Sequence, residues 1–398
     1  MTIDTERLRE LAAELGFWPA TIDEADIKRH RRHNKNAHHC QARTEDLILA
    51  ANECEGCVLV DGTVGGTIEG GDIGAIVKQL ADADRMGYAG VWSTEVARDP
   101  FLPVLLAAEH TPRLAIGTAI AVAFARNPMS MATVANDLQS LSSGKFMLGL
   151  GSQIKAHIER RFSMPWSRPA DRMREFVAAM HAIWDSWHND QPQDFRGDFY
   201  QHTLMPPAFR PGRNVFGAPP VLIAAVGSQM TSVAAEVADG LLVHGFTTER
   251  YLREVTVPQV NSVLVRERKS DSDFVLAYSG FAVTGSDERA LIKAAAAVRR
   301  QIAFYGSTPA YRGVLDLHGW GDLHTELHRL SKINSWDTMT GLIDDTMLNT
   351  FAVVGEPKEV GAEVRRRFGD IIDRFSFYAP YQLDPQACET MISEIHTA

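Results

Sequence analysis

The segment that decides the fold runs from Gly117 to Gln139 and reads GTAIAVAFARNPMSMATVANDLQ. The segment begins within an apolar run at residues 114–122. This run lacks the alternation of polar and apolar residues that a half-exposed strand shows. Such a run is typical of a strand covered on both faces, as in a parallel sheet. Asn127 and Pro128 then suit the N-cap and first turn of a helix, and apolar residues follow at steps of three and four. The segment therefore predicts one strand, loop and helix unit of a parallel α/β fold.

The same unit recurs along the chain. Apolar strands are predicted at residues 58–60, 90–93, 114–122, 145–149, 221–226, 241–243, 274–283 and 371–377. Helices are predicted at residues 72–86, 100–110, 128–141, 170–187, 230–238, 248–268, 287–304 and 356–368. Alternation of this kind over about 320 residues favours a (β/α)8 barrel, the TIM-barrel architecture, over an open doubly wound sheet.

Two segments do not fit the repeat. Residues 1–57 precede the first strand and are predicted to form a mostly helical N-terminal extension. Residues 305–350 interrupt the repeat, and long excursions of this kind often form lids or substrate covers. The predicted organisation is thus an extension at 1–57 and a barrel at 58–398 that carries an insertion at about 305–350.

Composition restricts the class of protein. With 398 residues, 45% of them hydrophobic, the chain can bury a large core. Its net charge of −10 and the lack of a dominant basic patch argue against a nucleic-acid partner. Four cysteines give no disulfide framework, and the longest apolar run is too short to span a bilayer. Residues 1–30 lack a signal-peptide core, so we expect a cytoplasmic protein without a membrane partner.

Histidine and cysteine side chains gather near the N-terminus, at residues 38–40, 54 and 57. Their spacing matches no standard zinc site, and we expect no metal.

Polar residues follow the predicted second strand. Thr94 and Glu95 come directly after it, and carboxylates at this end of a barrel strand are candidates for acid–base catalysis. Asp99 lies before Pro100 and is interpreted instead as a helix cap. Glu95 is therefore the stronger catalytic candidate of the two carboxylates.

Two further polar groups follow later strands. Ser152, Gln153 and His157 come after the fourth strand, where they can line a cofactor or form a solvated helix face. Gly227 and Ser228 lie between the fifth strand and its helix, where free N–H groups can bind a phosphate or simply form a tight turn. Signatures of serine hydrolases, zinc proteases and P-loop enzymes are missing, which suits chemistry carried by a bound cofactor.

Six stretches together carry a family resemblance that covers most of residues 58–380. They read GYAGVWSTEVARDPFLPVLLAAEHT, GTAIAVAFARNPMSMA, GKFMLGLGSQIKAHIERRF, PPVLIAAVGSQMTSVAAEVADGLLVH, RRQIAFYGSTPAYR and FAVVGEPKEV. The chain resembles the bacterial-luciferase-like superfamily, and more closely its oxidoreductases that use the deazaflavin coenzyme F420.

The resemblance implies a barrel with its cofactor at the carboxyl mouth, a small-molecule substrate and a homodimer. It implies a non-proline cis peptide at Ala119–Ile120 beneath the cofactor ring, and Glu95 as the acid or base with His157 as competitor. The remaining cofactor contacts that it implies are Thr94, Ser152, Gln153, Ala225, Val226, Gly227, Ser228, His244 and Thr247.

Three residues depart from the family pattern. The family's sugar-phosphate dehydrogenases carry Asp-His where this chain has Thr94 and Glu95, and Thr247 replaces a lysine expected near the tail phosphate. We expect an F420-dependent oxidoreductase that transfers a hydride between the deazaflavin and a small organic substrate. An FMN-dependent luciferase-like monooxygenase is the alternative, and a cofactor-carrying protein without turnover is a third hypothesis.

Overall fold

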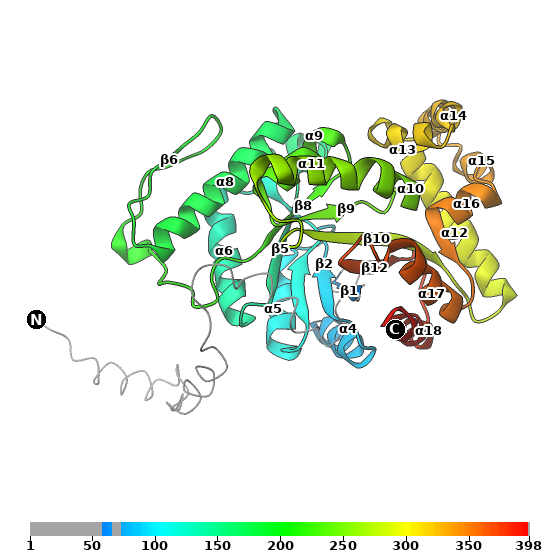
Figure 1. The fold of residues 1–398 in the computed structure, drawn as a ribbon, viewed down its shortest axis with the longest axis horizontal. Helices are drawn as coiled ribbons and strands as arrows, with labels where there is room; N and C mark the ends of the chain where they lie inside the picture. The colour runs from blue at the N-terminus through cyan, green and yellow to red at the C-terminus, as the bar shows by residue number, and fades with distance from the viewer. Residues whose placement is uncertain (1–57, 66–72, 397–398) are drawn as a thin grey trace, which may run out of the picture. The chain divides into compact units, whose positions relative to one another are not determined.

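A closed parallel barrel forms the centre of the computed structural model, which describes residues 58–65 and 73–396 (Figure 1). Each strand pairs with the next, and the last pairs with the first through Leu59 and Arg374. The eight strands are β1 (Leu59–Val64), β2 (Gly90–Ser93), β3 (Ala115–Thr118), β5 (Phe146–Gly151), β8 (Val221–Ala225), β9 (Gly240–Val243), β10 (Val275–Val283) and β12 (Arg374–Tyr378). The predicted (β/α)8 barrel is confirmed.

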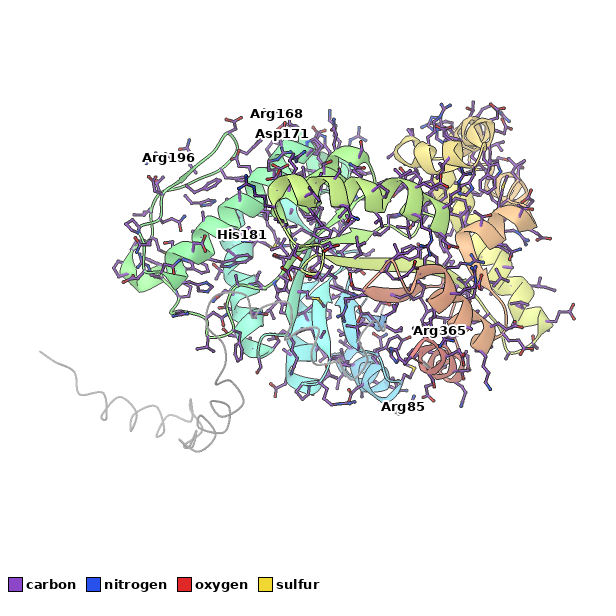
Figure 2. The ribbon with its side chains drawn as sticks, viewed as in Figure 1. Arg85, Arg168, Asp171, His181, Arg196 and Arg365 are labelled. Atoms are coloured by element: carbon purple, nitrogen blue, oxygen red, sulfur yellow. The ribbon has the colours of Figure 1, made fainter. Side chains whose placement is uncertain are left out.

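Helices follow the strands, as the sequence predicts, with one more C-terminal helix, residues 385–396, that the sequence analysis does not predict. They are α4 (Ile73–Arg85), α5 (Phe101–His110), α6 (Pro128–Leu141), α8 (Pro169–His188), α9 (Ser228–Val237), α11 (Val257–Glu267), α17 (Pro357–Phe368) and α18 (Pro385–His396). Asn127 caps α6 because its side chain accepts the N–H of Ser130. Arg85 of α4 and Arg365 of α17 both pair with glutamates of α18, which is thereby held by two neighbours (Figure 2).

The third strand breaks where the family resemblance implies a cis peptide, which confirms that expectation, although the apolar run alone predicts one strand over residues 114–122. It divides into β3 and the short β4 (Ala121–Val122), and the peptide bond between Ala119 and Ile120 is cis. β4 pairs with the end of β5, at Leu150 and Gly151. An unbroken apolar run cannot reveal such a break, because the residues on both sides of it remain buried.

The barrel interior contains a buried charge pair. Asp61 of β1 accepts two hydrogen bonds from the Arg374 guanidinium, at 2.5 and 2.7 Å, and a third from Trp92 Nε1 at 2.9 Å. The exposed fractions of Asp61 and Arg374 are 1% and 4%. A Cβ on Gly117 would lie 2.4 Å from the Trp92 ring, so glycine makes room for this side chain. Side chains therefore fill the barrel interior at the level of Asp61 and Trp92.

Residues 307–351 form short helices that pack on the long helix α12 (Glu288–Gly306). They are η5 (Pro309–Tyr311), α13 (Arg312–Leu317), α14 (Gly321–Lys332), α15 (Trp336–Gly341) and α16 (Asp345–Phe351), followed by strand β11 (Ala352–Val354) beside β10 (Figure 1). Their apolar residues form a second core cluster, which α12 joins through Val298 and Ile302. We call α12 and these helices the helical insertion.

The remaining elements are short. They are the turn η2 (Ala123–Ala125), α7 (Lys155–Arg160), the hairpin β6 (Phe195–Arg196) and β7 (Gln201–His202), η3 (Pro207–Phe209), α10 (Glu249–Tyr251) and the π-turn η4 (Leu252–Thr256). Among the described residues, no helix is both long enough and apolar enough to cross a membrane. The predicted N-terminal extension, with its histidines and cysteines, lies outside the described residues.

Candidate functional site

The carboxyl ends of the strands form one rim. Ser93 of β2 is level with Thr118 of β3, and Ala225 of β8 is level with Val243 of β9. Ligands bind at this face of a (β/α)8 barrel because the loops that follow the strands meet there. The rim is the candidate active site, and it brings together residues from the ends of β2, β3, β5, β8, β9 and β12.

Glu95 lies at the rim in an ion pair. Its Oε2 atom accepts hydrogen bonds from Arg126 Nη1 at 2.6 Å and from the Val122 N–H at 2.7 Å. The other Arg126 nitrogen, Nη2, pairs with Asp99 at 2.8 Å, and the guanidinium lies over the Phe101 ring. Glu95 is 6% exposed. The arginine after the third strand therefore joins two loops of the rim.

The cis peptide lies beside Glu95. The Glu95 N–H donates to the Ile120 carbonyl at 3.2 Å, and the Ala119 N–H donates to the Ser93 carbonyl at 2.8 Å. A Cβ on Gly151 would lie 2.8 Å from the Ile120 side chain, so glycine permits this close packing. Ala119 and Ile120 are half-buried and can form the floor of a cofactor-ring site.

The N-terminus of α9 is an open cradle. Gly227 is its N-cap and offers no side chain to the first-turn N–H groups. A Cβ on Gly227 would meet nothing within 4 Å, so a phosphate can approach this backbone closely. Gln259 fixes the turn by donating to the Ser228 carbonyl and to Ser232 Oγ. Ala225 is buried and Val226 half-buried beside the cradle.

Two hydroxyls of the site lack partners. Ser93 Oγ and Thr247 Oγ1 are buried, and no described residue forms a hydrogen bond with either atom. A buried hydroxyl without a partner is costly, so each suits a bound polar group. Together with the open cradle, these hydroxyls are compatible with a bound cofactor that carries a phosphate.

His244 follows β9 directly. Its Nδ1 atom accepts the Phe246 N–H at 3.0 Å, and its Nε2 atom lies 3.2 Å from the Tyr311 hydroxyl. Burial lowers the pKa of His244 to about 4, because desolvation disfavours the charged imidazolium. His244 is therefore a neutral hydrogen-bonding group at physiological pH.

The segment after β5 is more exposed. Ser152 and Gln153 are half-buried, and Gln153 has a positive φ of 58°. His157 on α7 is exposed, and its Nδ1 atom lies 3.1 Å from Gln153 Oε1. Thr94 is half-buried next to Glu95. Unlike Glu95, His157 forms no ion pair with another described residue.

Sequence reasoning missed three tyrosines of the site. Tyr305 and Tyr311 come from the helical insertion and contact the His244 ring, and Tyr378, from the end of β12, contacts Tyr305. The stretch RRQIAFYGSTPAYR contains two of them, but nothing in its periodicity indicates a contact with β9. Across residues 58–65 and 73–396, no group of His, Cys, Asp and Glu could hold a metal ion.

Comparison with known proteins identifies the family. The model of luciferase-like monooxygenases matches residues 56–374, and the chain belongs to this family. An uncharacterized protein of Mycobacterium tuberculosis is 53% identical over 308 residues, which cover 76% of this chain and 91% of the relative. The 5,10-methylenetetrahydromethanopterin reductase of Archaeoglobus fulgidus is 24% identical over 288 residues, covering 70% and 81%.

Solved structures share the fold at low identity. The coenzyme F420-dependent tetrahydromethanopterin reductase of Methanopyrus kandleri gives a TM-score of 0.69 at 19% identity, covering 86% of this chain and 98% of that one. The 3,6-diketocamphane monooxygenase of Pseudomonas putida, solved with FMN, gives 0.60 at 16% identity, covering 85% and 98%. The neighbours thus include both F420-dependent and FMN-dependent proteins.

Proposed function

We propose that the protein is an F420-dependent oxidoreductase that transfers a hydride between the deazaflavin and a small organic substrate. The observation that carries the proposal is the open N-terminus of α9 at Gly227, on the same rim as the cis peptide. The cradle suits the tail phosphate, and the floor at Ala119 and Ile120 suits a flat ring. Among similar proteins, the reductase of Methanopyrus kandleri is F420-dependent.

The residues of this chain would bind the cofactor and move the proton that accompanies the hydride. When bound, F420 would supply the ring carbon that gives or takes the hydride. Gly227 and Ser228 would hold the phosphate, while Thr247 Oγ1 and Ser93 Oγ would gain the partners they lack. Thr94, Ser152 and Gln153 would line the ring, and a positioned side chain must move the accompanying proton.

Glu95 and His157 are the two candidates for that proton transfer. Glu95 lies next to the cis peptide, but its carboxylate is held by Arg126 and by the Val122 N–H. His157 lies on α7, is exposed, and forms no ion pair within the part of the chain that the structure describes. We propose Glu95 as the acid–base group and His157 as its competitor, and the variants described below rank them.

An FMN-dependent monooxygenase is the second candidate function. The cradle residues 225–228 and Thr247 carry no charged side chain, and the free N–H groups at the start of α9 are enough for one phosphate. The rest of the polyanionic F420 tail would have to reach basic groups outside the cradle. The FMN complex of the Pseudomonas putida monooxygenase has the same fold.

Absorbance separates the two cofactors. Titration of the purified full chain with F420 and with FMN should give saturable binding of F420, measured from its band near 420 nm. Saturable binding of FMN alone would replace the proposal with the monooxygenase. A turnover screen with the bound cofactor then separates an enzyme from a carrier, because a carrier shows no substrate-dependent change in absorbance.

We further propose that the enzyme works in the cytoplasm as a homodimer, as the family resemblance implies, and that residues 1–57 are an extension to its barrel. Light scattering of the full chain tests the assembly.

Because β1 and β12 close the barrel from residue 59 onward, deletion of residues 1–57 should leave cofactor affinity within a few-fold of the full chain. Loss of binding in a folded truncation would assign the extension to the site.

A further inference from the structure

Four aromatic side chains meet where the helical insertion contacts the ends of β9 and β12. They are His244, Tyr305, Tyr311 and Tyr378, which we call the aromatic wall. Tyr311 stacks on His244 with ring centroids 4.7 Å apart, and Tyr305 meets His244 edge-on at the same distance. All four side chains are half-buried, so each keeps part of its surface accessible.

The hydrogen bonds of His244 fix its tautomer. Nδ1 accepts the Phe246 N–H and therefore carries no proton, so the neutral imidazole has its proton on Nε2. Nε2 must then donate to the Tyr311 oxygen at 3.2 Å. The Tyr311 hydroxyl already accepts this bond, and its own proton is left to donate to a bound molecule.

Tyr305 and Tyr378 form the second half of the wall. Their hydroxyls are 2.8 Å apart, and Tyr378 stacks on Phe281 with centroids 4.7 Å apart. A Cβ on Gly245 would lie 2.8 Å from the Tyr378 ring, so the backbone after β9 packs directly on it. The wall is thus fixed to the barrel by β9, β10 and β12.

Burial keeps His244, Tyr311 and Tyr378 of the wall uncharged at neutral pH. Burial lowers the pKa of His244 to about 4 and raises the pKa values of Tyr311 and Tyr378 above that of a free phenol. The wall itself therefore offers no positive side chain, and an anion placed against it would lose its hydration without gaining a counter-charge from these four residues.

We propose that the aromatic wall recognises an uncharged, planar substrate with a carbonyl or hydroxyl oxygen, which accepts a hydrogen bond from Tyr311. This inference rests on the proposed function, since it names the substrate class of the same site. His244 is a positioning residue, because it turns the Tyr311 proton toward the ligand. The wall disfavours phosphorylated and carboxylate substrates.

Three probes of similar shape test the inference on the full chain without cofactor. Acetophenone is planar with a neutral acceptor, ethylbenzene lacks the oxygen, and benzoate carries a negative charge. Saturation-transfer NMR and titration should show that acetophenone binds at least tenfold more tightly than benzoate. No transfer to acetophenone, or benzoate binding equally tightly, would overturn the proposal without any need for a variant.

Variants assign the preference to Tyr311. Tyr311→Phe should weaken acetophenone binding about three- to tenfold and leave ethylbenzene unchanged, as expected for one lost hydrogen bond. His244→Gln should also reduce the ratio of acetophenone affinity to ethylbenzene affinity. Tyr251→Phe, which removes a phenol outside the wall, should leave this ratio unchanged. If Tyr311→Phe leaves the ratio of acetophenone affinity to ethylbenzene affinity unchanged, the preference does not come from Tyr311.

The tautomer has its own measurement. Nitrogen-15 NMR of labelled protein at pH 7 should show His244 protonated at Nε2 and unprotonated at Nδ1. The opposite tautomer would remove the role of His244. Because none of these measurements uses F420, a failure of F420 binding is distinguishable from a failure of the wall.

Discussion

Glu95 and Arg126 join two loops of the barrel rim through a largely buried ion pair. Arg126 Nη1 lies 2.6 Å from Glu95 Oε2, and the two side chains are 19% and 5% exposed. Glu95 also binds the Val122 N–H just after the cis peptide, so the pair fixes the place where the third strand breaks. The carboxylate has two proposed tasks, proton transfer and support of this loop, and variants can separate them.

Glu95→Gln keeps the shape of the side chain and removes its titratable proton. If Glu95 is the acid–base group, turnover should fall about 10²–10⁴-fold while cofactor affinity stays nearly intact. His157→Asn should reduce turnover less. Steady-state kinetics and cofactor titration of both variants give the ranking.

Arg126→Gln is the matched control for that experiment. It leaves the Glu95 carboxylate in place but removes its partner, so it disturbs the loop without removing the proton. Equal losses of turnover in Arg126→Gln and Glu95→Gln would assign Glu95 to positioning. A stronger effect of His157→Asn would transfer the catalytic role to His157, and normal turnover in both would exclude both residues.

The sequence predicts the barrel because strand and helix periods alternate, and it predicts the start of α6 because Asn127 and Pro128 have local roles. It does not predict the aromatic wall. Tyr305 and Tyr378 are 73 residues apart in the chain yet share a hydrogen bond. Such contacts depend on how the insertion packs, which residue spacing does not encode. The buried partner of Glu95 is likewise a tertiary feature, 31 residues away.

Gly227→Asp tests the phosphate cradle. The new carboxylate would repel a phosphate at the α9 N-terminus, so cofactor affinity should fall at least tenfold, or about 1.4 kcal/mol. Gly227→Ala should leave stability nearly unchanged, because its Cβ has open space. Gly212→Asp is the control, since Gly212 is also unobstructed but lies outside the rim. Unchanged affinity in Gly227→Asp would remove the cradle from the cofactor site.

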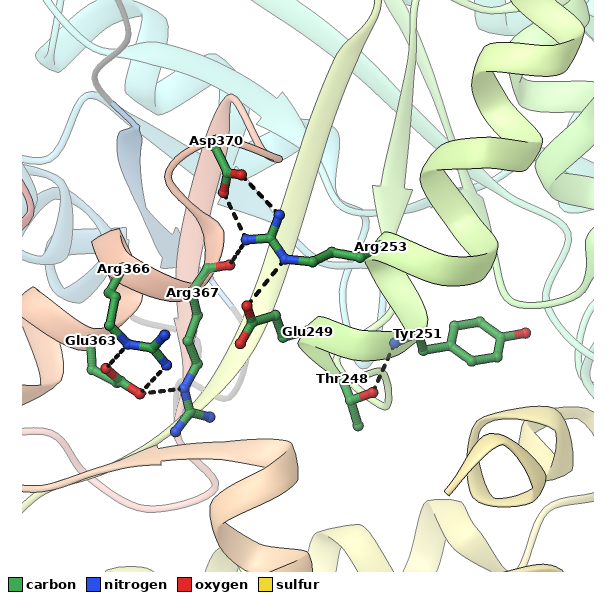
Figure 3. A network of polar contacts seen from close by, with 8 residues as sticks. All are labelled: Thr248, Glu249, Tyr251, Arg253, Glu363, Arg366, Arg367 and Asp370. Atoms are coloured by element: carbon green, nitrogen blue, oxygen red, sulfur yellow. Dashed lines mark hydrogen bonds and ion pairs between the residues drawn. The ribbon is translucent and has the colours of Figure 1, made fainter. Parts of the chain in front are cut away.

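Two bidentate ion pairs of different burial provide a stability test. Asp61→Asn leaves the Arg374 guanidinium buried without its counter-charge, and we expect a loss of about 3–5 kcal/mol. Asp370 binds Arg253 in the same way, with both distances 2.8 Å, but its side chain is 67% exposed (Figure 3). Asp370→Asn should therefore cost less than about 1 kcal/mol. Urea denaturation measures both, and equal losses would contradict the argument from burial.

The pH dependence of stability should report the burial of His244. The pKa of its imidazole is about 4 in the folded state, below the ordinary value of 6.5, so the unfolded state binds a proton that the folded state does not. The resulting stability is fully present above pH 6.5 and is lost as the pH falls toward 4, by up to about 3 kcal/mol. His244→Gln should flatten the profile of the unfolding free energy in this window, whereas Tyr311→Phe, which keeps the imidazole, should retain most of the slope. Urea titrations between pH 4 and 7 measure the three profiles. If wild type and His244→Gln give parallel curves, His244 is not held neutral by burial, and the hydrogen-bond assignment of the aromatic wall loses its basis.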